Sequence, residues 1–147
     1  MPEPLSPRLR AIVEALPLRP GLRVLEIGCG PGAAARAVAA RVTVGGAPGH
    51  VLGVDRSPAA IAAASRAGGE ATESGRLDFR CVAIESFRRE DGEPPYDIAF
   101  AIRVGALDGR HPRLEAQALD RIRAALTPQG RLFLDGGDPL LERPLRR

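Results

Sequence analysis

Two carboxylates and three glycines stand at the ends of apolar segments in this sequence. Gly28, Gly30 and Gly32 alternate directly after one such segment, and Glu26 lies two residues before the first glycine. Asp55 ends a second apolar segment, 23 residues after Gly32. Glycines at a strand end let backbone amides approach a ligand, and a carboxylate there accepts hydrogen bonds from ribose hydroxyls or attracts a cation. The pattern predicts a nucleotide-type pocket. In the alternative interpretation, Glu26 and Asp55 are solvated residues at strand ends without a ligand.

The elements that would carry this pocket alternate between strands and helices. Apolar runs and helix-starting signals predict strands over 23–27, 50–55, 77–83, 96–102 and 131–135, and helices over 7–16, 32–42, 57–67 and 112–126. We expect loops over 45–49, 68–75 and 87–95, a turn over 127–130, and an irregular segment after residue 135. The alternation predicts a Rossmann-like α/β fold, a doubly wound parallel sheet in three layers. Because neither a repeat nor a linker interrupts it, we expect one domain over residues 1–147.

Composition narrows the class of protein. Of the 147 residues, 44% are hydrophobic, 27% are charged and 3% are aromatic, with a formal net charge of +3. No segment has the length of apolar chain that crosses a membrane, and Met1–Pro4 does not open a signal peptide, so a cytoplasmic location is expected. Thinly spread basic charge with few aromatic rings does not favour nucleic-acid binding. Cys29 and Cys81 form no CxxC pair, so we expect two small buried side chains and no metal site.

Two nucleotide ligands fit the glycines. The stretch from Gly28 to Ala33 matches the dinucleotide pattern G-x-G-x-x-G/A, which favours an NAD(P)-dependent oxidoreductase. Pro31 removes an amide donor where a pyrophosphate would bind, and the Glu26 carboxylate opposes a phosphate while it suits an ammonium group. The sequence also has no lysine, and its one tyrosine, Tyr96, begins a strand.

The sequence resembles the class I S-adenosylmethionine-dependent methyltransferases. Four blocks carry the resemblance in the order typical of that family: Val24–Gly32 with its Glu26-x-Gly28-x-Gly30-x-Gly32 signature, Val51–Pro58, Tyr96–Phe100 and Leu126–Leu132. The resemblance implies S-adenosyl-L-methionine as cofactor and methyl transfer to a small-molecule acceptor.

Residue roles follow from the resemblance. It implies that Glu26 attracts the methionine ammonium group, that Asp55 accepts hydrogen bonds from both ribose hydroxyls, and that Arg56 flanks the adenine. The remaining cofactor-binding residues that it implies are Gly28, Cys29, Gly30, Gly32, Ala83, Ile84, Glu85 and Arg103. The family often has an acid directly after the third strand, where this chain has Ala83, so the backbone of Ala83 and Ile84 or a shifted Glu85 would contact the adenine.

Candidate catalytic residues lie after the fourth strand. Arg103 would hold a substrate carboxylate or phosphate, and Asp108 or His111 would act as a general base. Each also has an ordinary interpretation, Arg103 and Asp108 as solvated loop charges and His111 as a residue before a helix. The Asn-Pro-Pro-Tyr type motif of enzymes that methylate nucleic-acid bases is missing from this segment.

The resemblance predicts five strands in the order 3-2-1-4-5, without the last two strands of the seven-stranded family. An uncovered fifth strand needs a cover, so we expect residues 136–147 to lie along its edge or two chains to meet there as a homodimer. Three functions stay open: a methyltransferase, an NAD(P)-dependent oxidoreductase, and a non-catalytic cofactor-binding module that needs a partner.

Overall fold

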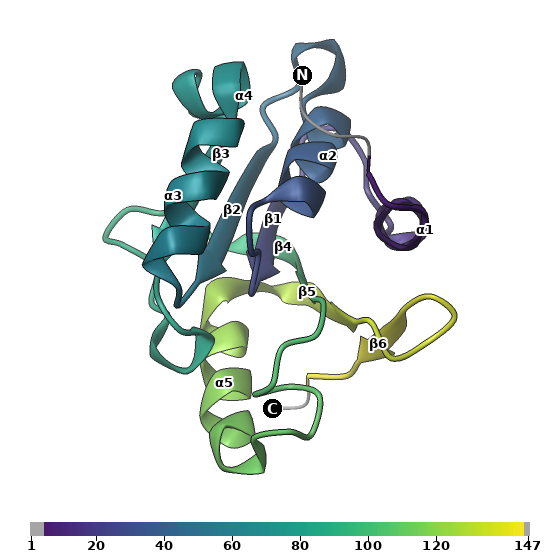
Figure 1. The fold of residues 1–147 in the computed structure, drawn as a ribbon, viewed down its shortest axis with the longest axis vertical. Coiled ribbons are helices and arrows are strands. Elements are labelled where there is room, and N and C mark those ends of the chain that lie inside the picture. The colour runs from purple at the N-terminus through teal and green to yellow at the C-terminus, as the bar shows by residue number, and fades with distance from the viewer. Residues whose placement is uncertain (1–4, 146–147) are drawn as a thin grey trace.

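Six strands form one sheet in the order β3-β2-β1-β4-β5-β6 in the computed structural model, which describes residues 5–145 (Figure 1). The strands are β1 (Arg23–Ile27), β2 (His50–Asp55), β3 (Leu77–Cys81), β4 (Tyr96–Ala101), β5 (Leu126–Leu134) and β6 (Leu141–Arg143). The first five run parallel, and β6 is antiparallel to β5. The predicted order 3-2-1-4-5 is therefore confirmed, with one strand added.

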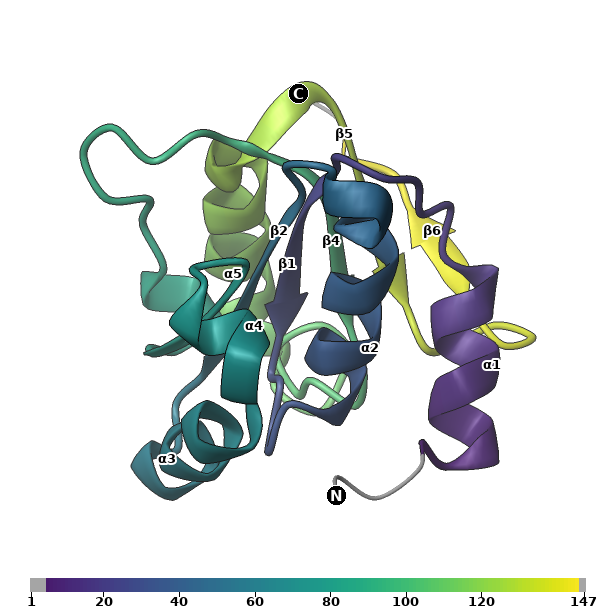
Figure 2. The same ribbon diagram turned by 90° about the horizontal axis from the view of Figure 1, so that it is seen from above.

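Helices cover both faces of the sheet, which gives the predicted three layers (Figure 2). They are α1 (Pro7–Ala15), α2 (Ala33–Val42), α3 (Pro58–Ala67), α4 (Gly69–Glu73) and α5 (Pro112–Ala125), with short 3-10 helices η1 (Val44–Gly46) and η2 (Ile84–Ser86). One core joins α1 and α2 to the sheet, and a second core joins α5 and η2 to the opposite face. Within residues 5–145, no helix combines the length and apolar composition that a membrane crossing requires.

Ser-Pro pairs begin two of the helices, as the sequence predicts. The Ser6 hydroxyl accepts a hydrogen bond from the Leu9 N–H at 3.2 Å, and the Ser57 hydroxyl accepts one from the Ala60 N–H at 3.2 Å. The proline after each serine occupies a first-turn position whose N–H would have no helical partner. The start of α3 therefore fixes the chain directly after Asp55, the last residue of β2 and the residue predicted to bind the ribose.

The segment after β5 is not irregular, as predicted, but contains β6. Leu132, Phe133 and Leu134 pair with Arg143, Glu142 and Leu141. The Arg131 and Glu142 side chains form an ion pair at 2.8 Å across the two strands. The expected cover for the fifth-strand edge is thus provided by this segment, and a homodimer at this edge stays a prediction. Arg146–Arg147 of the predicted cover and Met1–Pro4 lie outside the described residues.

Four smaller expectations were wrong. The expected loop over 68–75 contains α4, and the expected turn over 127–130 lies within β5 as an irregularity. There Tyr96 faces Leu126 while Ile98 faces Arg131, so β5 bulges against β4. The expected loop over 45–49 begins within η1. Cys81 is exposed rather than buried, because it ends β3 at the sheet surface, whereas Cys29 is buried as expected.

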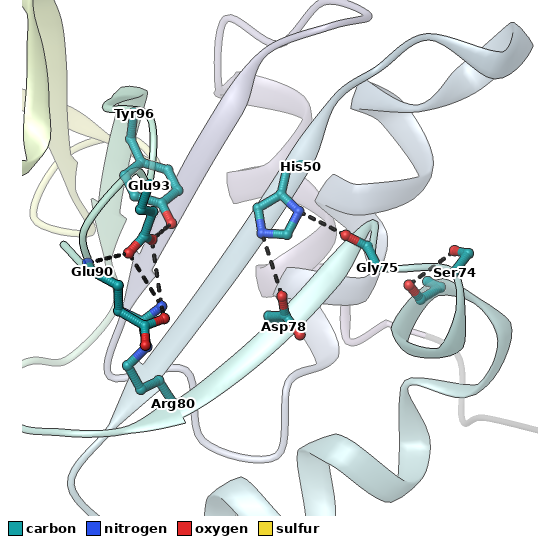
Figure 3. A network of polar contacts seen from close by, with 9 residues as sticks. His50, Ser74, Gly75, Asp78, Arg80, Glu90, Glu93 and Tyr96 are labelled. Carbon is teal, nitrogen blue, oxygen red and sulfur yellow. Dashed lines mark hydrogen bonds and ion pairs between the residues drawn. The ribbon is translucent and has the colours of Figure 1, made fainter.

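Polar contacts link residues of β2, β3 and β4 to the loops before β3 and β4 (Figure 3). Arg80 contacts Glu90 at 3.0 Å and Glu93 at 3.3 Å, and the Tyr96 hydroxyl donates to Glu93. Burial and the hydrogen bond to Glu93 raise the pKa of Tyr96. His50 contacts the Gly75 carbonyl oxygen at 2.9 Å. The one tyrosine of the chain therefore belongs to a structural network at the end of the strands opposite to the glycines.

Candidate functional site

A cleft of about 290 Å³ opens at the carboxyl ends of the parallel strands, where ligands bind in folds of this kind. The predicted residues that line it are Gly28, Asp55, Arg56, Ala83, Ile84, Glu85, Arg103 and His111. The predicted residues that do not line it are Glu26, Cys29, Gly30, Gly32 and Asp108. The ends of β1, β2, β3 and β4 thus surround one cleft. Gly28 of the glycine loop lines this cleft, whereas Cys29, Gly30 and Gly32 do not.

The glycine loop has a backbone that other residues would strain. Gly28 has a φ of +67°, and a Cβ atom there would lie 2.7 Å from Cγ2 of Val104 in the loop after β4. Gly32 has a φ of +87° and leads into α2, and its Cβ would lie 2.8 Å from the Phe79 ring. L-residues with side chains rarely adopt this region, so the glycines let the loop pass close to its neighbours and open the cleft above β1.

Asp55 joins the glycine loop to the start of α3. One of its carboxylate oxygens accepts the Gly30 N–H at 2.9 Å, and the other accepts the Ser57 N–H at 2.9 Å. Each oxygen has further acceptor capacity, because an ionised carboxylate accepts about four hydrogen bonds. The carboxylate is therefore fixed in place while it lines the cleft, in a form suited to two neighbouring hydroxyl donors. Arg56, directly after it, is exposed on the same wall.

Glu26 is a buried carboxyl group beneath the glycine loop. The residue is 3% exposed, and its Oε1 atom has no hydrogen-bond partner within residues 5–145. Burial raises the pKa of Glu26 to about 8, the backbone N–H of Ala35 lowers it, and the negative charge of Asp55 raises it. A cation close to this carboxyl group would favour its ionised form and offset the cost of burial. Neighbouring Cys29 is also buried, and burial raises the pKa of its thiol.

The segment after β3 forms the wall next to Asp55. Ala83 precedes η2, Ile84 is buried and Glu85 is half-buried, and all three line the cleft. The Gln117 side chain of α5 donates a hydrogen bond to the Glu85 carbonyl oxygen at 2.7 Å, which ties this wall to the helix below it. The structure therefore places Glu85 at the rim although it lies two residues beyond the usual acidic position.

The loop after β4 forms the opposite wall, and side chains from two other segments hold it. Arg103 has a φ of +56°, unusual for a residue other than glycine. Its N–H donates to the Asp135 carboxylate at 3.1 Å, and its carbonyl oxygen accepts from the Arg110 guanidinium at 2.6 Å. His111 lines the cleft beside Arg103. Asp108 does not line this cleft, and its carboxylate forms an ion pair with Arg110 at 2.8 Å.

A second pocket of about 320 Å³ lies on the other side of Val104. Its walls come from the ends of β4 and β5, the loop after β4, and β6. The residues that line it are Ala101, Val104, Leu107, Asp108, Leu134, Asp135, Gly136, Leu141 and Arg143. Its three charged groups each have an internal counter-charge: Asp108 with Arg110, Asp135 with Arg8 and Arg143 with Glu115. This pocket is mostly apolar, and β6 completes it.

A comparison with protein-family models matches residues 24–130 to the model described as a methyltransferase domain. The chain belongs to the methyltransferase domain family. This finding confirms the resemblance drawn from the four sequence blocks. One curated relative of this methyltransferase domain is the protein-L-isoaspartate O-methyltransferase of Methylorubrum extorquens, 37% identical over 131 residues, which are 87% of this chain and 47% of that protein.

Solved structures share the fold of the methyltransferase domain. The crystal structure of the [4+2]-cyclase SpnF matches with a TM-score of 0.66 and 28% identity, over 86% of this chain and 42% of that one. A SAM-dependent methyltransferase from Geobacter sulfurreducens in complex with S-adenosyl-L-homocysteine matches with a TM-score of 0.64 and 21% identity, over 90% of this chain and 49% of that one. The chain spans between 30% and 47% of the length of the curated relatives it matches.

Sequence reasoning missed three residues of the methyltransferase domain that shape the cleft. Asp135 ends a parallel strand as an acid, just as Asp55 does, so the same signal would have found it. Arg110 and Val104 lie in an irregular loop with no periodic pattern, and their roles depend on the turn that Arg103 makes. That turn has no local signature, because part of its support comes from Asp135, directly after β5.

Proposed function

We propose that this methyltransferase domain binds S-adenosyl-L-methionine in the cleft and transfers its methyl group to a small-molecule acceptor. The observation that carries the proposal is the pair of carboxylates around the glycine loop, with Asp55 lining the cleft and Glu26 buried beneath the loop. Membership of the methyltransferase domain family supports the same assignment.

The chemistry of these groups fits the proposed cofactor. Oε1 of Glu26 is buried without a hydrogen-bond partner among the described residues, and an ammonium group would supply the missing positive charge and donor. The negative charge of Asp55 already raises the pKa of Glu26, so it disfavours the ionised form of Glu26. A pyrophosphate in the same place would add further negative charge beside this carboxyl group. Asp55 would hold the ribose hydroxyls, and the wall from Ala83 to Glu85 would flank the adenine.

The cofactor, when bound, supplies a methyl group already activated by a sulfonium centre. The main task of the chain is therefore to hold the acceptor in line with the bond that breaks. Gly28 after β1, and Val104 and Gly105 in the loop after β4, line the cleft beyond the proposed cofactor-binding wall, where the acceptor would lie. Of the two predicted bases, His111 lines the cleft and is the one that would accept a proton from the acceptor, whereas Asp108 lines the second pocket and pairs with Arg110.

Calorimetry with S-adenosylhomocysteine, NADH and methylthioadenosine tests the ligand. We expect S-adenosylhomocysteine to bind and NADH not to bind, and the reverse result would overturn the proposal. Methylthioadenosine keeps the adenosine but lacks the amino-acid part, so Glu26→Gln should weaken only the homocysteine compound. Equal losses for both ligands would refute the assignment of Glu26 to the ammonium group.

A second candidate function is a cofactor-binding module that needs a partner for catalysis. The observation in its favour is that His111 is the one predicted base that lines the cleft, since Asp108 pairs with Arg110 and lines the second pocket. Incubation of the purified chain with S-adenosylmethionine and a library of small acceptors separates the two functions. Formation of S-adenosylhomocysteine that depends on an added acceptor supports the enzyme, and cofactor binding without any turnover supports the module.

A further inference from the structure

We propose that Arg103 binds a carboxylate of the acceptor, so that the acceptors of this domain are small organic acids. The inference rests on the proposed function, because a cofactor held by Asp55 leaves the β4 side of the cleft for the acceptor. Arg103 follows β4, and β1 separates β4 from β2, which ends at Asp55.

The first support is the charge of the two walls. Asp55 and Glu85 are the acids that line the cleft: Asp55 ends β2, with Arg56 directly after it, and Glu85 follows β3. The lining residues after β4 include no acid; they include Arg103, His111, and Arg110, whose charge is balanced by Asp108. The acids of the cleft therefore lie on its β2 and β3 side, and the uncompensated charge of Arg103 on the β4 side attracts an anion.

The second support is that the Arg103 guanidinium is free to bind a ligand. Among residues 5–145 its side chain forms no ion pair and no hydrogen bond, although it lines the cleft. Three nearby arginines differ, because Arg110, Arg8 and Arg143 pair with Asp108, Asp135 and Glu115. Arg56 also lines the cleft without an ion pair or a side-chain hydrogen bond among residues 5–145, but it lies next to Asp55 on the opposite wall. On the β4 side, the Arg103 guanidinium matches the two oxygens of one carboxylate. A phosphate dianion carries more negative charge than one guanidinium balances. The charge of Arg110, on the same wall, is already balanced by Asp108.

The third support is the turn that presents Arg103. A φ of +56° is disfavoured for arginine, and such strain persists only where the surroundings impose it. The Asp135 carboxylate holds the N–H of this residue, and the Arg110 guanidinium holds its carbonyl oxygen. Asp135 is itself fixed by Arg8 of α1 at 2.8 Å. Contacts from β5, α1 and the following loop therefore hold the turn, so that the guanidinium starts from a fixed backbone.

The test measures binding to the protein loaded with S-adenosylhomocysteine. A library of small carboxylic acids, each paired with its own amide, is screened by ligand-observed NMR, with inorganic phosphate as a separate probe. Arg103→Gly removes the guanidinium and suits the positive φ, and Arg103→Gln keeps a long polar side chain. Arg113→Gln removes an equal charge from an exposed position close by that does not line the cleft.

We expect acids to bind more often than their amides, and the best acids to bind about tenfold more weakly to both Arg103 variants but normally to Arg113→Gln. Acids that bind no better than amides would overturn the proposal, and so would equal losses in the Arg113 control. Tight phosphate binding that depends on Arg103 would also overturn it. If Arg103→Gly weakens S-adenosylhomocysteine but not methylthioadenosine, the guanidinium serves the cofactor and the acceptor assignment is wrong. Failure of the cofactor itself to bind the wild-type protein would instead refute the proposed function.

Discussion

Replacement of Glu26 by glutamine should change how the stability of this domain depends on pH. Glu26 is 3% exposed, and burial raises its pKa from an ordinary 4.5 to about 8. Between these values the folded protein retains a proton that the unfolded chain has lost. The free energy of unfolding therefore falls as pH rises through this window, and it levels off above pH 8. Glutamine has nearly the same shape but no proton to lose, so the variant lacks this contribution.

The expected size follows from the shift. One pKa unit corresponds to about 1.4 kcal/mol, so between pH 6 and pH 9 the wild-type protein should lose about 3 kcal/mol relative to Glu26→Gln. Other titrating groups, such as His50, are common to both proteins and cancel in the difference. Binding of S-adenosylhomocysteine should oppose the loss, because its ammonium group favours the ionised carboxylate. Close to one proton should then be released on binding near pH 7.

Urea denaturation of both ligand-free proteins at pH 6, 7, 8 and 9 provides the measurement. The two curves of unfolding free energy against pH should separate steadily up to pH 8 and run parallel above it. Calorimetry in buffers of different ionisation enthalpy counts the released proton, which Glu26→Gln should not release. Parallel stability curves over the whole range would show that Glu26 titrates normally, and would refute the reasoning from burial.

Three further predictions concern the loop, the ribose ligand and the far edge of the sheet. Gly28→Ala should cost about 1–2 kcal/mol of unfolding free energy, because its φ is +67° and its Cβ would lie 2.7 Å from Val104. Adding Val104→Ala should recover part of that loss, and no change in urea denaturation would contradict the loop geometry. Asp55→Asn should weaken S-adenosylhomocysteine and methylthioadenosine equally, by about 1–3 kcal/mol in calorimetry, since both keep the ribose. Unchanged affinity would discredit the ribose assignment. Tyr96→Phe should cost about 1–3 kcal/mol of stability, because the bond to Glu93 is lost, and should leave ligand affinity unchanged. A weaker ligand instead would place Tyr96 at the site.

Local signals predicted most of the fold and the outline of the site. Apolar runs that end in glycine or an acid located β1 and β2, and Ser-Pro pairs located the starts of α1 and α3. The order of the first five strands came with the family resemblance and was confirmed. These features depend on residues that are close in the sequence, so one sequence is sufficient to find them.

Features that depend on distant partners could not be predicted in the same way. β6 has three residues, too few for an alternating pattern, and it forms because β5 offers an open edge. Asp108 was a candidate base on position alone, but it lines the second pocket and pairs with Arg110. The positive φ of Arg103 depends on Asp135, 32 residues later.

The short strand β6 forms one wall of the second pocket, and this wall can open locally. Three residue pairs hold β6 to β5, and Leu141, which lines the pocket, is 40% exposed. Segments with few buried contacts open at low free energy, well before the whole domain unfolds. The amides of β6 should therefore exchange with deuterium long before those of β1 and β4 at the centre of the sheet. Each such opening would expose the second pocket to solvent from the side of β6, and amide exchange at this edge would report how often it occurs.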